Sequence, residues 1–194
     1  MSKKIAVTRD KKVCGKETKF IESLIVGGNG GVQNVVLYLA DIKKGKKFAT
    51  PSSDLQIDQR GCQFRPHVFI VPAGKSFDLI NSDGILHNFR TNSTENPILN
   101  KAQPKFKKKL TIRINKPEII RVNCDVHEWM NAWLVVTDHP YYALTDGSGS
   151  FKIADIPPGT YSLQLWHETL GRQTRKVTVK AGGDTQVAFE LKKK

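Results

Sequence analysis

One stretch of the chain decides both the fold and the chemistry that we expect from it: Cys124-Asp125-Val126-His127-Glu128-Trp129-Met130. It follows the run Ile119–Val122, which is rich in β-branched residues, and Ala132–Thr137 leaves it as the next apolar run, so both flanks are typical of strands. A thiolate, an imidazole and a thioether recur at every third position of the loop between them. Soft sulfur ligands together with imidazole favour copper, and one thiolate, two imidazoles and a weak axial thioether form an electron-transfer copper site.

The second imidazole has to come from another part of the chain, and His87 is the candidate. It follows the predicted strand Ser76–Ile80 and the predicted turn Asn81–Gly84. In a β-sandwich this position falls at the same end as the loop that begins at Cys124, so one site can form between them. We therefore predict a single copper ion with these ligands: His87, Cys124, His127 and Met130.

Three neighbouring residues have expected supporting roles. Asn88 can hydrogen-bond to Asp125 and so hold the two ligand segments together. Trp129 flanks His127 and is expected to form an apolar rim with nearby side chains. The sequence predicts that a partner docks on this rim and that the electron leaves through the edge of His127.

Two other interpretations of the loop stay open at this point. A Cys-x-x-His pair can be half of a zinc site, although zinc rarely takes a thioether and no second Cys/His pair follows. Cys124 and Met130 can also be core residues, with His127 as a surface histidine. The presence of His87-Asn88 upstream favours copper over both.

A second metal site is a weaker hypothesis, with His67, His167 and Glu168 as its candidates. By strand alternation His67 shares a face with Phe69 and Val71, which is typical of a buried histidine whose hydrogen bonds are satisfied. His167-Glu168 comes at the end of a predicted strand and is typical of a loop pair.

The rest of the 194-residue chain indicates an all-β protein. Nearly every apolar pattern alternates with a period of two, and turn sequences rich in Gly, Pro, Asp and Ser separate the runs. Hydrophobic residues make up 39% and charged residues 25%, which are globular values, and there is no run of about 18 apolar residues to span a membrane. The predicted strands include Phe20–Val26, Val35–Leu39, His67–Val71, Tyr142–Thr145, Ser150–Ile153, Thr160–Trp166, Arg172–Val179 and Thr185–Leu191.

The patterns predict two domains. Residues 54–138 carry the predicted ligands, and residues 139–194 form a meander without evident chemistry. Five strands are few for an independent core, so we expect the N-terminal strands of residues 1–53 to pair with the C-terminal domain and make it discontinuous in sequence.

The region from about Asp54 to Asp138 resembles the cupredoxins of the plastocyanin and amicyanin type. The motifs that carry the resemblance are Phe64–Gly74, Ile80-Asn81-Ser82-Asp83, His87-Asn88 and Cys124–Met130. It implies a Greek-key β-sandwich with one type 1 copper ion. The C-terminal part, with Thr145–Ile153 and Ile156–Leu163, resembles a carboxypeptidase regulatory-like (transthyretin-like) β-sandwich, a family in which a strand similar to Gly31–Leu39 comes early.

Cysteine usage and charge bear on the compartment and the partner. With Cys124 as a ligand, Cys14 and Cys62 remain as a candidate disulfide pair, which needs an oxidising compartment. We therefore expect a periplasmic or extracytoplasmic protein whose signal peptide has been removed. The net charge of +13 includes five lysines between Lys101 and Lys109. The lysines of the chain are otherwise spread out and lack the interleaved aromatics of a single-strand binder, so we expect no nucleic acid and an acidic redox protein as the partner.

The function predicted from these observations is that of a one-electron carrier and not of an enzyme. Two alternatives use the same soft ligands. One is a Cu(I) chaperone or storage protein, and the other is a subunit of a copper oxidoreductase with a second metal.

Overall fold

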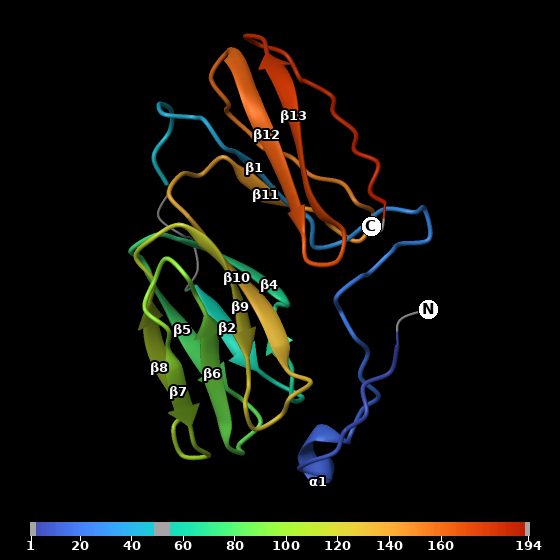
Figure 1. Ribbon diagram of the computed structural model, residues 1–194, viewed down its shortest axis with the longest axis vertical. Helices are drawn as coiled ribbons and strands as arrows, with labels where there is room; N and C mark the ends of the chain where they lie inside the picture. The colour runs from blue at the N-terminus through green and yellow to red at the C-terminus, as the bar shows by residue number, and fades with distance from the viewer. Residues whose placement is uncertain (1–2, 49–54, 193–194) are drawn as a thin grey trace. The chain divides into compact units, whose positions relative to one another are not determined.

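The computed structural model describes residues 3–48 and 55–192 and divides them into two compact units, each described by itself below (Figure 1). The first unit comprises residues 3–20 and 55–138, and the second comprises residues 21–48 and 139–192. The predicted boundary at residues 53 and 54 lies outside the described residues. Residues 3–20 lie in the first unit, whereas the sequence assigned all of 1–53 to the second. The physical reason is a disulfide that ties Cys14 to Cys62.

The first unit contains two sheets. One has five strands, in the order β4 (Val68–Pro72), β10 (Asn131–Thr137), β9 (Glu118–Asn123), β6 (His87–Asn92) and β7 (Asn100–Gln103). The other has four, in the order β3 (Phe64–Arg65), β2 (Gln56–Gln59), β5 (Ser76–Asn81) and β8 (Lys109–Arg113). The connections from β5 to β6, from β7 to β8 and from β8 to β9 pass from one sheet to the other. The helix α1 (Lys11–Cys14) precedes all of these strands.

Both sheets contribute to one apolar core, so the first unit is a β-sandwich. Alternation along β5 buries Phe77 and Leu79 from one sheet, and alternation along β9 buries Ile120 and Val122 from the other. The ring of Phe77 lies 6.3 Å from that of Phe89 on β6, an edge contact between the two layers. The prediction of an all-β fold is confirmed.

The second unit contains one antiparallel sheet in the order β11 (Tyr142–Leu144), β1 (Val36–Leu39), β12 (Gly159–His167) and β13 (Gly171–Val179). Figure 1 shows β12 and β13 as a long hairpin. Strand β1 pairs with β11 on one side and with β12 on the other, although more than 100 residues separate it from both. Its Leu37 and Leu39 are buried in the core of this unit.

Phe20–Val26, predicted as a strand, has only isolated β-bridges at its two ends. Two further segments predicted as strands, both in the second unit, are irregular. Neither 150–153 nor 185–191 contains a strand, yet both pack apolar side chains on the core of this unit. Side chains of β13 hold the second segment: Arg175 donates to the carbonyl of Ala188 at 2.8 Å, and Gln173 donates to that of Glu190 at 2.9 Å. These side-chain bonds take the place of a backbone ladder.

Candidate metal centre

Strand alternation carries two of the predicted ligands into the core of the first unit. On β6 the residues that point inward are His87, Phe89 and Thr91, each 0% exposed. On β9 the inward series of Ile120 and Val122 continues to Cys124 just beyond the strand, which is 2% exposed. The periodicity that builds the core therefore also turns an imidazole and a thiol toward its end.

The loop after β9 closes on itself by backbone hydrogen bonds. The N–H of Cys124 donates to the carbonyl of Met130 at 3.2 Å, and the N–H of Met130 donates to that of His127 at 2.8 Å. This turn buries His127 completely and places Met130, which is 1% exposed, in the same core cluster as Cys124.

Three of the predicted ligands converge. The Nδ1 atoms of His87 and His127 lie 3.0 Å apart, and the Sγ atom of Cys124 lies 3.9 Å from each of them. These three buried groups form one of the clusters of potential metal ligands in the described part of the chain.

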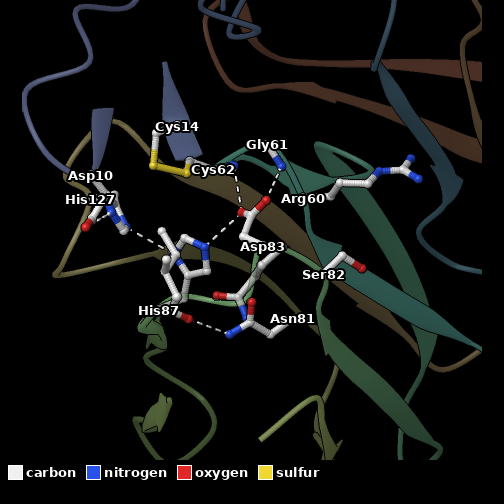
Figure 2. Close-up of polar contacts among 12 residues, drawn as sticks. Asp10, Cys14, Arg60, Gly61, Cys62, Asn81, Ser82, Asp83, His87 and His127 are labelled. Atoms are coloured by element: carbon white, nitrogen blue, oxygen red, sulfur yellow. Dashed lines mark hydrogen bonds and ion pairs between the residues drawn. A yellow bond between two sulfur atoms is a disulfide. The ribbon is translucent and has the colours of Figure 1, made fainter. Parts of the chain in front are cut away.

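Each imidazole is bound on its other side by a carboxylate. The Nε2 atom of His87 lies 2.9 Å from Oδ2 of Asp83, and that of His127 lies 2.8 Å from Oδ2 of Asp10. Two backbone N–H groups orient Asp83 in turn, those of Gly61 at 2.6 Å and Cys62 at 2.8 Å (Figure 2). Gly61 and Cys62 both have positive φ, 62° and 54°, and successive N–H groups in such a turn form a concave anion-binding site.

These contacts fix which nitrogen of each ring can bind a metal. An ionised carboxylate only accepts hydrogen bonds, so each Nε2 carries a proton and donates it. The Nδ1 lone pairs of His87 and His127 then face each other across 3.0 Å, which is stable only with a shared proton or a cation between them.

The donor set fits a first-row metal ion. Bonds of about 2.0 Å to nitrogen and about 2.3 Å to sulfur reach donors that are up to about 4.0 Å (N to N) and about 4.3 Å (N to S) apart. The observed separations of 3.0 and 3.9 Å are shorter than these limits, so one ion can contact all three groups.

The surroundings of Cys124 favour the thiolate form of its side chain. Burial raises its pKa, but hydrogen bonds with His127, with His87 and from the N–H of Asn88 outweigh burial and lower the pKa to about 6. Burial likewise lowers the pKa of His87, and its hydrogen bonds to Asp83 and Cys124 outweigh this effect and raise the pKa above its ordinary value. A thiolate is the form that binds metals, and metal binding to such a thiol releases its proton.

Asn88 joins the two ligand segments, as the sequence suggested it would. Its Nδ2 donates to Oδ2 of Asp125 at 3.0 Å and to Oδ1 of Asn100 at 2.7 Å. The backbone N–H of Asp125 donates back to Oδ1 of Asn88, and the N–H of Asn88 points at Sγ of Cys124 at 3.5 Å. The residue that follows one ligand thus bonds to the residue that follows the other.

The outer edge of His127, through which the electron was expected to leave, is covered in the structure. Trp129 flanks His127, with ring centroids 5.1 Å apart, but its Nε1 donates to the carbonyl of Cys62 at 3.0 Å. His127 is 0% exposed, and its outer nitrogen contacts Asp10 instead of solvent. The reason is residues 3–20, which the sequence had placed in the other unit.

Within the described residues, the clusters of three or more potential metal ligands do not include His67, His167 or Glu168, the candidates for a second metal site. His67 is buried between β3 and β4, where its carbonyl accepts the N–H of Trp133 at 2.8 Å. The Nδ1 atom of His167 accepts the N–H groups of Thr169 and Leu170, both at 3.2 Å. Glu168 follows it in the turn between β12 and β13.

Sequence reasoning missed both carboxylates. Asp83 had a signal, because it lies four residues before His87 at the end of a motif already singled out. Asp10 had none, since more than 100 residues separate it from His127.

No helix among residues 3–48 and 55–192 is long and apolar enough to cross a membrane.

Comparisons with known proteins give partial matches. The family described as polysaccharide lyase family 4, domain II, matches residues 113–187, which run from the first unit into the second. No curated protein matches. Among solved structures, the chain is similar to a copper-containing nitrite reductase from Thermus scotoductus SA-01, with 17% identity and a TM-score of 0.38 over 50% of this chain and 27% of that one.

Two smaller proteins match over nearly their whole length. A purple cupredoxin from Nitrosopumilus maritimus is 16% identical, with a TM-score of 0.37 over 43% of this chain and 100% of that one. Amicyanin from Paracoccus versutus (Thiobacillus versutus) is 14% identical, with a TM-score of 0.39 over 52% of this chain and 97% of that one.

Proposed function

We propose that the first unit binds one copper ion in a type 1 site and that the protein carries single electrons between redox partners. The ligands are His87, Cys124 and His127, with Met130 as the weak axial ligand. Copper bound to this set supplies reversible one-electron chemistry. The chain itself supplies a rigid, dry cage in which Asp83, Asn88 and the loop hydrogen bonds hold the ligands.

One observation carries the proposal. Two imidazole Nδ1 atoms face each other at 3.0 Å, a low-pKa thiol lies 3.9 Å from both, and each Nε2 is already engaged by a carboxylate. Zinc would also accept these three donors. The buried thioether of Met130 at the end of the same loop and the resemblance to cupredoxins favour copper.

Ligand burial favours a carrier over a Cu(I) chaperone. A chaperone hands its metal to a partner by ligand exchange, which requires at least one donor at the surface. Here Cys124 is 2% exposed, and His87 and His127 are 0% exposed. Electrons can leave such a site through the surrounding protein, but the ion itself cannot leave without opening the fold.

The proposed partner is an acidic redox protein that docks on the loop between β7 and β8. β7 ends at Gln103 opposite His87, so this loop lies at the ligand end of the sheet. Phe106 is 85% exposed, and four exposed lysines surround it in sequence: Lys105, Lys107, Lys108 and Lys109. The lysines attract an acidic surface from a distance, and Phe106 offers that surface an apolar contact once it has docked.

The proposed location is extracytoplasmic. The support is the disulfide between Cys14 and Cys62, whose Cα atoms lie 5.3 Å apart. Such bonds persist in oxidising compartments and are rare in the cytosol.

Copper loading of the metal-free protein tests the function. Cu(II) titration should give one equivalent bound and an intense visible band from thiolate-to-copper charge transfer. Cys124→Ser should abolish the band, and His87→Gln should weaken copper binding. His139→Gln, a histidine of the second unit, is the matched control and should leave both unchanged. A colourless wild-type protein, or a band that persists in Cys124→Ser, would contradict the proposal.

A further inference from the structure

The N-terminal segment, residues 3–20, is fastened to the metal-site unit at several points. The disulfide joins Cys14 to Cys62, and the segment folds back on itself through a bridge between Lys4 and Phe20. Inside the fold, Lys19 is only 5% exposed and donates through Nζ to the carbonyl of Cys14 at 2.5 Å. The segment is therefore an integral part of the first unit, although it contributes no strand to the sandwich.

This segment delivers one side chain to the metal site. Asp10 adopts a left-handed conformation, with φ of 48° and ψ of 42°, directly before α1. Its carbonyl accepts the N–H groups of Val13 and Cys14, both at 2.9 Å, and this turn directs its carboxylate to Nε2 of His127 at 2.8 Å (Figure 2). The sulfurs of Cys14 and Cys62 also lie within 4.8 Å of a ring nitrogen of His127. The outer edge of the imidazole is therefore covered by the segment.

We infer that Asp10 is a positioning residue of the metal site and that the disulfide-anchored segment closes the His127 edge. The inference rests on the proposed function for its copper readout. By accepting the Nε2 proton, Asp10 holds His127 in the tautomer whose Nδ1 lone pair points at the metal, and its charge makes the ring a better donor. Carboxylates that contact metal-bound histidines in this way orient the ring and strengthen the bond.

The arrangement also changes the route for electrons. A His127 edge covered by Asp10 and the cysteine pair is not a surface on which a partner can dock. This agrees with the proposed docking surface on the β7–β8 loop, on the side of His87, where Phe106 and the lysines are exposed.

The first test uses the metal-free protein and does not depend on copper. In ¹⁵N-labelled protein, the Nε2–H of His127 should give an imidazole proton signal that is protected from exchange with water. Asp10→Ala should lose this signal, and Asp10→Asn, which keeps an oxygen acceptor, should restore it in part. Glu17→Gln removes an exposed acid from the same segment and should leave the signal unchanged.

The second test loads the same variants with copper. Asp10→Ala should bind Cu(II) about 10-fold more weakly than wild type, whereas Glu17→Gln should bind it equally well. Replacement of both Cys14 and Cys62 by alanine should also expose the Nε2–H. Retention of the protected signal and of full affinity in Asp10→Ala would overturn the inference. Absence of copper binding in wild type would overturn the proposed function instead, since the signal of the metal-free protein decides the role of Asp10 alone.

Discussion

Asn88 and Asp125 hold each other by two hydrogen bonds, one from the Asn88 side chain to the Asp125 carboxylate at 3.0 Å and one from the Asp125 backbone to the Asn88 side chain. Each residue directly follows a proposed ligand, so the pair ties the start of β6 to the ligand loop. The relative placement of His87 and Cys124 therefore depends on a contact that includes neither of them.

Removal of this tie should loosen the site. Asn88→Ala leaves the N–H of Asp125 without its acceptor, and we expect a loss of about 1–3 kcal/mol in the free energy of unfolding. Copper affinity should fall as well, because the two ligand segments are no longer joined. Chemical denaturation and copper titration measure the two effects.

Asn92→Ala is the control for that experiment, since Asn92 lies on the same strand but bonds to Arg121 and Asn123 on β9 and not to the ligand loop. It should lower stability without weakening copper binding. Equal copper affinity in Asn88→Ala and wild type would contradict the proposed role of the tie.

Met130 should affect the metal more than the fold. Met130→Leu keeps the buried volume, so the cost in stability should stay below about 1.5 kcal/mol. The weak axial donor is lost, while the thiolate and both imidazoles remain. We expect copper to bind, the visible band to persist, and the reduction potential to change. Voltammetry beside wild type checks this, and an unchanged potential would argue against Met130 as a ligand.

Acid should weaken the first unit through Glu118. Burial raises the pKa of this carboxyl, but hydrogen bonds from Ser93, Thr94, Asn96 and Glu95 outweigh burial and lower the pKa to about 2. A carboxylate whose pKa is lowered on folding stabilises the protein above its unfolded pKa, near 4.5, and this contribution is lost as the pH falls through about 2.

Glu118→Gln measures that contribution. We expect it to lower the free energy of unfolding by about 1.5 kcal/mol at pH 7, a modest figure because the group is partly open to solvent. The difference from wild type should shrink below pH 4.5 and disappear near pH 2. A difference that stays constant over this range would show that the carboxylate charge is not involved.

Salt should slow association with an acidic partner. Exposed charges are screened within about 8–10 Å at moderate ionic strength. The rate of electron exchange with an acidic redox protein should therefore fall as salt rises, and Lys107→Gln with Lys108→Gln should flatten this dependence. Replacement of Lys152 and Lys180, which lie in the second unit, is the control. A rate independent of salt would rule out the β7–β8 loop as the steering surface.

Strand alternation made much of this architecture predictable. The series Ile120, Val122 and Cys124 reads from the sequence as the inward face of one strand, and the spacing from Cys124 to Met130 defines the loop. β6 was missed because its inward residues include His87 and Thr91, so the strand has no apolar alternation to detect. A strand whose inward face carries polar functional residues lacks the alternation of apolar and polar residues by which strands are recognised.

The covering segment was unpredictable for another reason. The cysteine count suggested a bond between Cys14 and Cys62, but only the fold shows that Cys62 lies beside both histidines. Asp10 then reaches His127 through a turn with a left-handed residue and a four-residue helix, neither of which has a signal in the local sequence. Contacts fixed by a long-range covalent bond cannot be derived from local periodicity.

Cys62 contacts the supports of both imidazoles. Its N–H donates to Asp83, which binds His87, while its disulfide anchors the segment that carries Asp10 to His127. Its carbonyl also accepts the indole N–H of Trp129. Alignment of the His127 ring therefore depends on an oxidation event that involves no ligand. We expect the order of maturation to matter: a chain given metal before its cysteines are joined has every donor present, but lacks the anchored segment that holds the His127 ring.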